Sequence, residues 1–239
     1  MKIKELLTKK PFGIVGHRGA RGVKPENTIS AIEYGINAGV DIVEIDVRRT
    51  KDGKLILLHD LDFKRFTGRA IKPSELELEF IKENIKIDGE PVATLDEALE
   101  FVNGKAGIFI EIKEPITTDD VLALILKHNA LSWTAVISFY DEALKTAKQL
   151  LPSITTGLIY MKPPGRIFDA KKLEADFVLP YYKIATEKAN YTAHKLGLQV
   201  VVWTINDEET ALEMLKRKAD VMATDYPQML VKLRNSLSD

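Results

Sequence analysis

Several features that mark other protein classes are missing from this chain of 239 residues. It contains no cysteine, which excludes a disulfide framework, a thiolate nucleophile and a cysteine-ligated zinc or iron–sulfur site. It has no basic run that could follow a nucleic-acid backbone, no acidic tail, and a formal net charge of −1. No apolar run is long enough to cross a bilayer. We therefore expect neither a nucleic-acid partner nor stable membrane insertion.

The chain also lacks linkers rich in glycine, serine or proline, and low-complexity segments. Its length fits one large α/β unit, so we expect a single domain over residues 1–239. The first ten residues are charged and hold no apolar stretch of the kind that forms a secretion signal, which favours a cytoplasmic location. The sequence leaves the oligomeric state open, with a homodimer among the alternatives.

Short apolar runs alternate with amphipathic helical patterns along the whole chain. Strands are expected at Gly13–Gly19, Ile42–Arg48, Gly107–Lys113, Thr134–Phe139, Thr155–Tyr160, Asp176–Tyr182, Gln199–Ile205 and Val221–Asp225. Helices are expected at Thr28–Ala38, Thr94–Val102, Asp119–His128, Asp141–Leu151, Thr186–Leu196, Glu208–Lys218 and Pro227–Leu237. This alternation indicates parallel pairing, and eight such units in a chain of this length predict a closed (β/α)8 TIM barrel.

The alternation of strands and helices is interrupted once, after the second expected strand. Residues 54–58 are expected to pair back on that strand through a turn at residues 51–53. Residues 60–93 exceed what a loop between a strand and a helix requires. We interpret them as an insertion over the top of the barrel.

Three acidic residues are expected to point into the barrel. Side chains alternate across a strand, so Glu44 and Asp46 share one face while the apolar residues between them share the other. Glu111 follows the same rule on the next barrel strand. Buried charges are costly unless they pair or bind a metal, and the carboxyl ends of barrel strands are where active sites form. The set of oxygen ligands favours one hard divalent cation, Mg²⁺ or Ca²⁺.

A purely structural interpretation of these acids stays open. Ion pairs with Arg18, Arg48 and Lys113 would also satisfy the three carboxylates, because charge networks occur at barrel rims without any catalytic role.

Two of the four histidines lie at expected strand ends on the same rim. His17 ends the first strand and His59 follows the second unit, so both flank the three acids and are candidates for proton transfer. His128 and His194 lie on or at the end of helices away from this rim, and we assign them no role.

Other candidates for substrate contacts lie near the same rim. Arg18 and Lys113 could bind phosphate and stabilise charge in the transition state, and Lys162 is a weaker phosphate candidate. Glu26 could reach the metal or substrate hydroxyls, in a segment otherwise typical of a turn and a helix cap. Trp203 could belong to the core or form one wall of the pocket.

In these motifs taken together, the sequence resembles the glycerophosphodiester phosphodiesterases. The resemblance rests on motifs that follow the family order from one end of the chain to the other: Gly16–Gly19, Pro25–Thr28, Glu44–Val47, Asp52–Gly53, His59–Asp60, Glu111–Lys113, Trp203–Asn206 and Thr224–Pro227.

The resemblance implies a barrel with an insertion after the second strand. It also implies Glu44, Asp46 and Glu111 as metal ligands, and His17 and His59 as the acid–base pair. Lys113 and Arg18 would then lie near the phosphate.

The activity expected on these grounds is metal-dependent hydrolysis of a small glycerophosphodiester to an alcohol and sn-glycerol 3-phosphate. Attack by the glycerol 2-hydroxyl, giving a cyclic phosphate, competes with direct attack by water. Hydrolysis of lysophospholipids is the alternative within the same class, and an apolar patch of Phe63, Phe66 and Phe80 would favour it. A silent phosphate-binding protein is less consistent with two intact proton-transfer groups.

Overall fold

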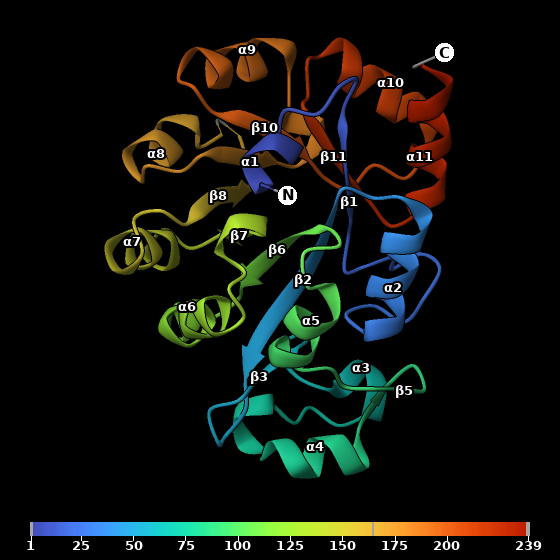
Figure 1. Ribbon diagram of the computed structural model, residues 1–239, viewed down its shortest axis with the longest axis vertical. Helices are drawn as coiled ribbons and strands as arrows, with labels where there is room; N and C mark the ends of the chain where they lie inside the picture. The colour runs from blue at the N-terminus through green and yellow to red at the C-terminus, as the bar shows by residue number, and fades with distance from the viewer. Residues whose placement is uncertain (1, 164, 238–239) are drawn as a thin grey trace.

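Eight parallel strands close into a barrel in the computed structural model, which describes residues 2–163 and 165–237 (Figure 1). They are β1 (Gly13–Gly16), β2 (Ile42–Arg49), β6 (Gly107–Ile112), β7 (Thr134–Ser138), β8 (Thr155–Tyr160), β9 (Phe177–Pro180), β10 (Gln199–Val202) and β11 (Val221–Thr224). Strand β1 pairs in parallel with both β2 and β11, which closes the ring. The predicted TIM barrel is confirmed, and all eight expected strands are present.

Helices surround the barrel (Figure 1). They are α2 (Ile29–Ala38), α5 (Leu95–Val102), α6 (Thr118–Lys127), α7 (Asp141–Leu150), α8 (Ile167–Lys172), α9 (Glu187–Lys195), α10 (Glu208–Lys216) and α11 (Pro227–Ser236). Short 3-10 turns η2 (Pro115–Thr117), η3 (Leu131–Trp133) and η4 (Tyr182–Ile184) complete the connections. Among the residues described, none of the helices combines the length and apolar character needed to span a membrane.

Local sequence explains where these helices begin. The Thr28 hydroxyl accepts a hydrogen bond from the backbone of Ala31 at the start of α2, and Asp207 does the same for Thr210 in α10. At the other end of α2, Gly39 adopts a left-handed conformation that terminates the helix. These caps fix the lengths of the loops that lead to and from the strands.

One end of the barrel is closed by the chain's own N-terminal segment. The short helix α1 (Ile3–Leu6) lies across that end, and Ile3 and Leu7 pack with the side chains that fill the barrel interior (Figure 1). A separate apolar cluster lies between the strands and the surrounding helices. Only the carboxyl ends of the strands are therefore left as a mouth, the usual place for an active site in this fold.

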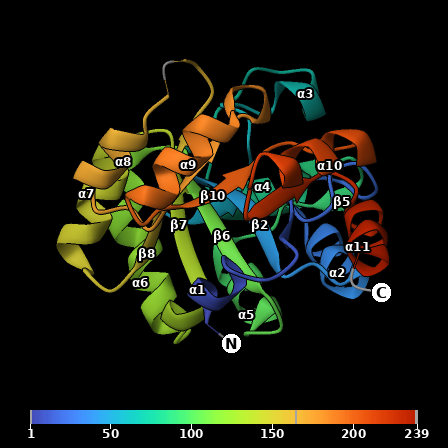
Figure 2. The same cartoon turned by 90° about the horizontal axis from the view of Figure 1, so that it is seen from above.

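The insertion begins after β3 (Leu55–Leu57), which pairs antiparallel with β2, as expected for residues 54–58. It consists of α3 (Lys64–Thr67), η1 (Pro73–Glu75), α4 (Leu78–Asn84), β4 (Lys86–Ile87) and β5 (Glu90–Pro91). These elements gather beside the barrel, beyond β3, and α3 stands on the side of the molecule opposite to α1 (Figures 1 and 2).

The insertion packs beside the barrel, and its helix α3 lies on the mouth side, opposite to α1 (Figure 2). Its apolar side chains, among them Phe63 and Ile81, pack with Ile56 and Leu58 in a small core of their own. Burial of that core holds the insertion against the flank of the barrel. Asp60 and Leu61 line a second cavity at the mouth, together with His59, Glu111 and Lys113. None of residues 60–93, all of which the structure describes, lines the main cavity, which we define as the one that contains both His17 and His59.

Candidate active site

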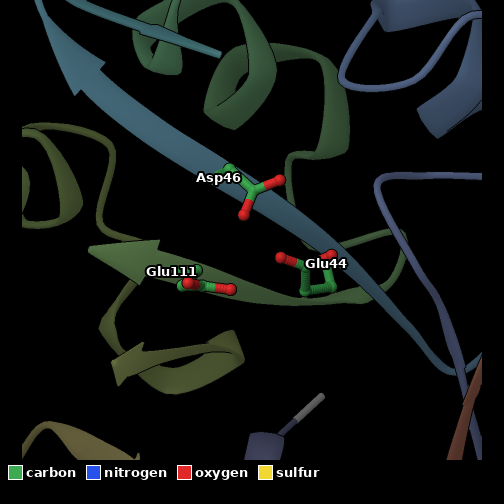
Figure 3. Close-up of side chains that lie close together, drawn as sticks. All are labelled: Glu44, Asp46 and Glu111. Atoms are coloured by element: carbon green, nitrogen blue, oxygen red, sulfur yellow. The ribbon is translucent and has the colours of Figure 1, made fainter. Parts of the chain in front are cut away.

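The register between β2 and β6 gathers three carboxylates at the mouth. Asp46 lies opposite Glu111 across the two strands, and Glu44 lies two residues before Asp46 on the same face. Their side chains point toward a shared space (Figure 3), and one oxygen from each lies within 4.8 Å of the other two. All three residues are buried, with Asp46 only 1% exposed.

Burial and mutual repulsion perturb these acids strongly. Burial, together with the charges of Asp46 and Glu111, raises the pKa of Glu44 well above its usual value. Burial and the charge of Asp46 raise the pKa of Glu111 to about 7. Burial also acts on Asp46, but the positive charges of Lys113 and Arg18 outweigh it and lower the pKa of that carboxyl. The triad therefore concentrates more negative charge than its neighbours neutralise.

Two cations partly balance the triad. The Lys113 ammonium lies 2.5 Å from Glu111 Oε1 and 3.0 Å from Asp46 Oδ1. Arg18 places its Nε 3.4 Å from Asp46 Oδ2 and donates its backbone N–H to Glu44 Oε2 at 2.8 Å. Glu44 Oε1, in contrast, is buried and has no hydrogen-bond partner.

His17 is held by a carboxylate from the far end of the chain. Its Nδ1 lies 2.7 Å from Asp225 Oδ1, and Asp225 Oδ2 accepts a hydrogen bond from Asn206 at 2.8 Å. Because an ionised carboxylate can only accept, this contact places the hydrogen on Nδ1. Nε2 then faces the triad, 4.0 Å from Glu44 Oε2.

His59 is oriented in the same manner by its neighbour in sequence. Its Nδ1 lies 3.0 Å from Asp60 Oδ1, and its backbone carbonyl accepts hydrogen bonds from Arg48. Burial and the nearby charges of Lys113 and Arg18 lower the pKa of His59, so the neutral imidazole is favoured at neutral pH. Arg48 itself pairs with Glu114 and not with the triad, so the structural alternative does not hold for Arg48.

The two histidines line one cavity of about 300 Å³ together with Glu44 and Glu111, two of the three acids. Trp203 forms part of its wall, and its indole N–H donates to the Leu179 carbonyl at 2.8 Å. Polar groups that line the cavity are His17, Arg18, Arg21, Glu44, His59, Glu111, Lys113 and Thr204. The remaining wall is apolar and includes side chains of the barrel interior. A small ester with one anionic group fits this combination of charged rim and apolar floor.

Two of the predicted substrate contacts lie elsewhere. Glu26 is buried outside the triad, where it accepts hydrogen bonds from Arg18 and Arg65. Lys162 is exposed and is not part of the cavity wall. His128 and His194 pair with Asp96 and Asp220 and do not line the cavity.

Residues that the sequence did not single out complete the site. Asn27 donates its amide N–H to Asp46 Oδ2 at 2.8 Å and accepts the backbone N–H of Asp46 at 3.0 Å. Its motif was visible, but the segment was assigned to a turn. Asp60 and Asp225 lie within motifs quoted above, yet their contacts with the histidines could be recognised only in three dimensions.

The aromatic patch on the insertion that would favour lysophospholipid substrates does not form. Phe63 is fully buried in the insertion core, whereas Phe80 is 48% exposed. Phe66 is partly buried against the same core, so the three rings present no common surface.

Comparisons with known proteins agree with this geometry. The chain is 29% identical to a glycerophosphodiester phosphodiesterase of Caldanaerobacter subterraneus over 236 residues, which cover 92% of this chain and 96% of the relative. The crystal structure of the glycerophosphodiester phosphodiesterase of Thermotoga maritima superposes with a TM-score of 0.82 at 29% identity, covering 95% of this chain and 100% of that one.

A phosphodiesterase of Oleispira antarctica, solved in complex with the product sn-glycerol-3-phosphate, superposes with a TM-score of 0.83 at 25% identity, covering 95% of this chain and 97% of that one. The glycerophosphoryl diester phosphodiesterase family matches residues 17–229, a range that includes both histidines, the three acids and Asp225. With that match over most of its length, the chain belongs to this family and is a phosphoric diester hydrolase, a glycerophosphodiester phosphodiesterase.

Proposed function

We propose that this enzyme hydrolyses glycerophosphodiesters to an alcohol and sn-glycerol 3-phosphate with one bound divalent cation and two histidines as general acid and base. The observation that carries the proposal is the buried triad of Glu44, Asp46 and Glu111. Glu44 and Glu111 line the same cavity as two imidazoles that are each oriented by an aspartate.

The donor set fits a hard cation. Three carboxylates offer oxygen atoms within 4.8 Å of one another, and Glu44 Oε1 is buried without any other partner. Oxygen ligands of this kind suit Mg²⁺ and Ca²⁺. When bound, such an ion supplies positive charge that polarises a phosphate oxygen. The structural alternative accounts for Asp46 and Glu111, which contact Lys113, but leaves Glu44 Oε1 unexplained.

The chain's own residues supply the remaining chemistry. Lys113 and Arg18 line the cavity and provide positive charge for the non-bridging phosphate oxygens, on which charge increases in the transition state. One histidine accepts the proton of the attacking oxygen at Nε2, and the other donates a proton to the departing alcohol. Trp203 and the apolar wall limit access of water to the reacting atoms.

The attacking oxygen distinguishes two routes. Attack by the 2-hydroxyl of the glycerol expels the alcohol and gives a cyclic phosphate, which water then opens to sn-glycerol 3-phosphate. The first step avoids the entropy of bringing in a second reactant. Attack by water gives sn-glycerol 3-phosphate in one step. A substrate that lacks the 2-hydroxyl separates them, since it stays fully active only if water attacks directly.

Glycerophosphodiesters are favoured over lysophospholipids as substrates. The aromatic patch on the insertion that would bind an acyl chain does not form, because Phe63 is buried. The apolar cavity wall, in contrast, suits a longer substrate.

The proposal is tested by product analysis with matched substrates. Purified protein is incubated with glycerophosphocholine or lysophosphatidylcholine, with chelator and then with added Mg²⁺ or Ca²⁺. We expect release of sn-glycerol 3-phosphate from glycerophosphocholine that stops with chelator and returns with either ion. Choline release from lysophosphatidylcholine at a higher kcat/KM would support the alternative, and no hydrolysis of either substrate would reject both.

A further inference from the structure

One side chain of the insertion bridges two acids beside the mouth of the barrel. Arg65, on α3, donates from Nε to Asp60 Oδ2 at 2.7 Å. Its two terminal nitrogens donate to the two oxygens of Glu26, at 3.0 Å to Oε2 and 2.5 Å to Oε1. Arg65 thus uses three of its donors on two carboxylates.

Each of these acids in turn holds a residue of the proposed active site. Asp60 contacts Nδ1 of His59 at 3.0 Å, and Glu26 accepts a hydrogen bond from Arg18 at 2.8 Å. Arg65 and Glu26 line neither the main cavity nor the second cavity at the mouth, and Asp60 lines only the second. Any influence of Arg65 on the reaction must therefore pass through its partners.

The charges explain why an arginine is needed at this position. Glu26 is 5% exposed and keeps a lowered pKa because the hydrogen bond from Arg65 and the charge of Arg18 outweigh the effect of burial. Asp60 likewise keeps a lowered pKa, against partial burial, through its bonds to His59 and Arg65. The planar fork of a guanidinium can bind two carboxylates at fixed angles, whereas a lysine ammonium acts as a point charge.

The packing of the insertion sets where this guanidinium lies. The residue two positions earlier, Phe63, is fully buried in the insertion core, and its backbone N–H donates to the Ile71 carbonyl at 3.0 Å. The Phe66 ring lies 4.4 Å from the Arg65 guanidinium carbon. The core beside the barrel therefore supports Arg65 from one side, while the two acids hold it from the other.

We infer that Arg65 is a positioning residue, which fixes Asp60 on His59 and Glu26 on Arg18 and so couples the insertion to the reaction. The inference rests on the proposed function of His59. Loss of Arg65 frees Asp60 to rotate away from the imidazole, while Arg18 retains Glu26 and Asp46. The expected consequence is a fall in kcat larger than any change in KM.

The test compares Arg65→Ala, Arg65→Lys, Asp60→Ala and the double variant that combines Arg65→Ala with Asp60→Ala. Lys64→Ala is the control. Lys64 neighbours Arg65 on the same short helix and has an exposed side chain. We expect Arg65→Ala to lower kcat about tenfold to a hundredfold, the range typical of groups that orient a functional ligand. Lys64→Ala keeps the wild-type kcat, and Arg65→Lys recovers only part of the loss.

Two further readouts separate positioning from stability. The double variant should be no slower than the slower single variant, because Arg65 acts through Asp60 and the two losses are not additive. Guanidinium chloride at low, non-denaturing concentration should restore part of the kcat of Arg65→Ala by occupying the vacated space.

Three results would overturn the inference: wild-type kcat in Arg65→Ala, fully additive losses in the double variant, or a loss of activity that follows the drop in melting temperature without guanidinium rescue. Each of these leaves the proposed function standing as long as the wild-type protein releases sn-glycerol 3-phosphate.

Discussion

Two imidazoles at the mouth of the barrel are oriented by carboxylates of different origin. Asp60 follows His59 directly, whereas Asp225 is 208 residues away from His17 along the chain. Both contacts use Nδ1 and so leave Nε2 for proton exchange with substrate. A histidine that only stabilised the fold would have no need of this orientation toward the cavity.

Removal of either imidazole should reduce turnover without unfolding the protein. We expect His17→Ala and His59→Ala each to lower kcat by about 10²–10⁴, the usual contribution of a general acid or base. His128→Ala serves as the control, because His128 pairs with Asp96 away from the cavity. Steady-state kinetics with glycerophosphocholine measure turnover, and circular dichroism shows whether the fold is retained. Unchanged turnover in either active-site variant would remove that histidine from the mechanism.

Asp225 provides a test of orientation alone. Its carboxylate holds Nδ1 of His17 and has a lowered pKa because the contact with His17 outweighs partial burial. Replacement by Asn weakens this hold, and we expect kcat to fall about tenfold or more with little change in melting temperature. Asp220→Asn is a matched control, since Asp220 makes the same 2.7 Å contact with His194 outside the cavity. Equal kinetic effects of the two substitutions would contradict a specific role for Asp225.

At the scale of elements, the turn between β1 and α2 determines where His17 and Arg18 lie. Gly19 has a left-handed backbone with φ of 82°, and a Cβ at this position would lie 2.5 Å from the carbonyl carbon of Ala31 in α2. No side chain fits such a close approach of two backbone segments. The second glycine of the motif is thus required by packing of the turn on the helix.

Gly19→Ala should therefore lower the free energy of unfolding by more than the backbone strain of a left-handed alanine alone would. Gly53→Ala is the control, because Gly53 has a similar φ of 77° but no atom lies within 4 Å of the place that an added Cβ would occupy. We expect about 1 kcal/mol for Gly53→Ala and an additional 1–3 kcal/mol or so for Gly19→Ala from overpacking. Urea unfolding curves give both values, and equal losses would show that the close approach carries no cost.

Strong local periodicity explains which elements the sequence could predict. The eight barrel strands and seven of the helices were expected because their patterns extend over enough residues to show a period. Helices α1 and α8, of 4 and 6 residues, are too short to show one. The insertion was recognised by its length, but its position depends on the core that it forms with β3, which no local pattern reveals.

The same distinction applies to the candidate site. Alternation along β2 and β6 was sufficient to place Glu44, Asp46 and Glu111 on the inner face. The contact of His17 with Asp225 instead requires the pairing of the first and last strands, in which Gly16 lies beside Thr224. Lys162 was chosen by its place near a strand end, and the direction of that loop could not be known from sequence.

At the scale of the whole molecule, the acid triad makes the stability of the fold depend on pH and on the binding of a cation. The pKa of Glu111 rises from 4.5 to about 7 on folding, and that of Glu44 is also raised, so these two groups hold more protons in the folded chain than in the unfolded chain. This contribution to stability is complete below pH 4.5 and is lost as the pH rises through about 7. His59, whose pKa is lowered, acts in the opposite direction near neutral pH.

A cation that binds the triad should therefore stabilise the protein more at pH 8 than at pH 6, because at pH 6 it must first displace protons. We expect the melting temperature to rise with Mg²⁺ or Ca²⁺ relative to chelator, by the equivalent of about 2.7 kcal/mol at a hundredfold excess over Kd. Comparison with and without cation at each pH cancels the effect of His59. In Glu111→Gln both the increase and its pH dependence should shrink; an increase independent of pH in the wild type would contradict ion binding by these acids.

The most direct test of the central claim is a titration of Mg²⁺ into chelator-treated protein, with release of sn-glycerol 3-phosphate from glycerophosphocholine as the readout. For the wild type we predict no turnover before the titration and recovery along a one-site saturation curve. For Glu111→Gln we predict half-recovery at a cation concentration about tenfold to a hundredfold higher. Full turnover in the presence of chelator, or identical curves for the two proteins, would contradict an active site built on a cation held by Glu44, Asp46 and Glu111.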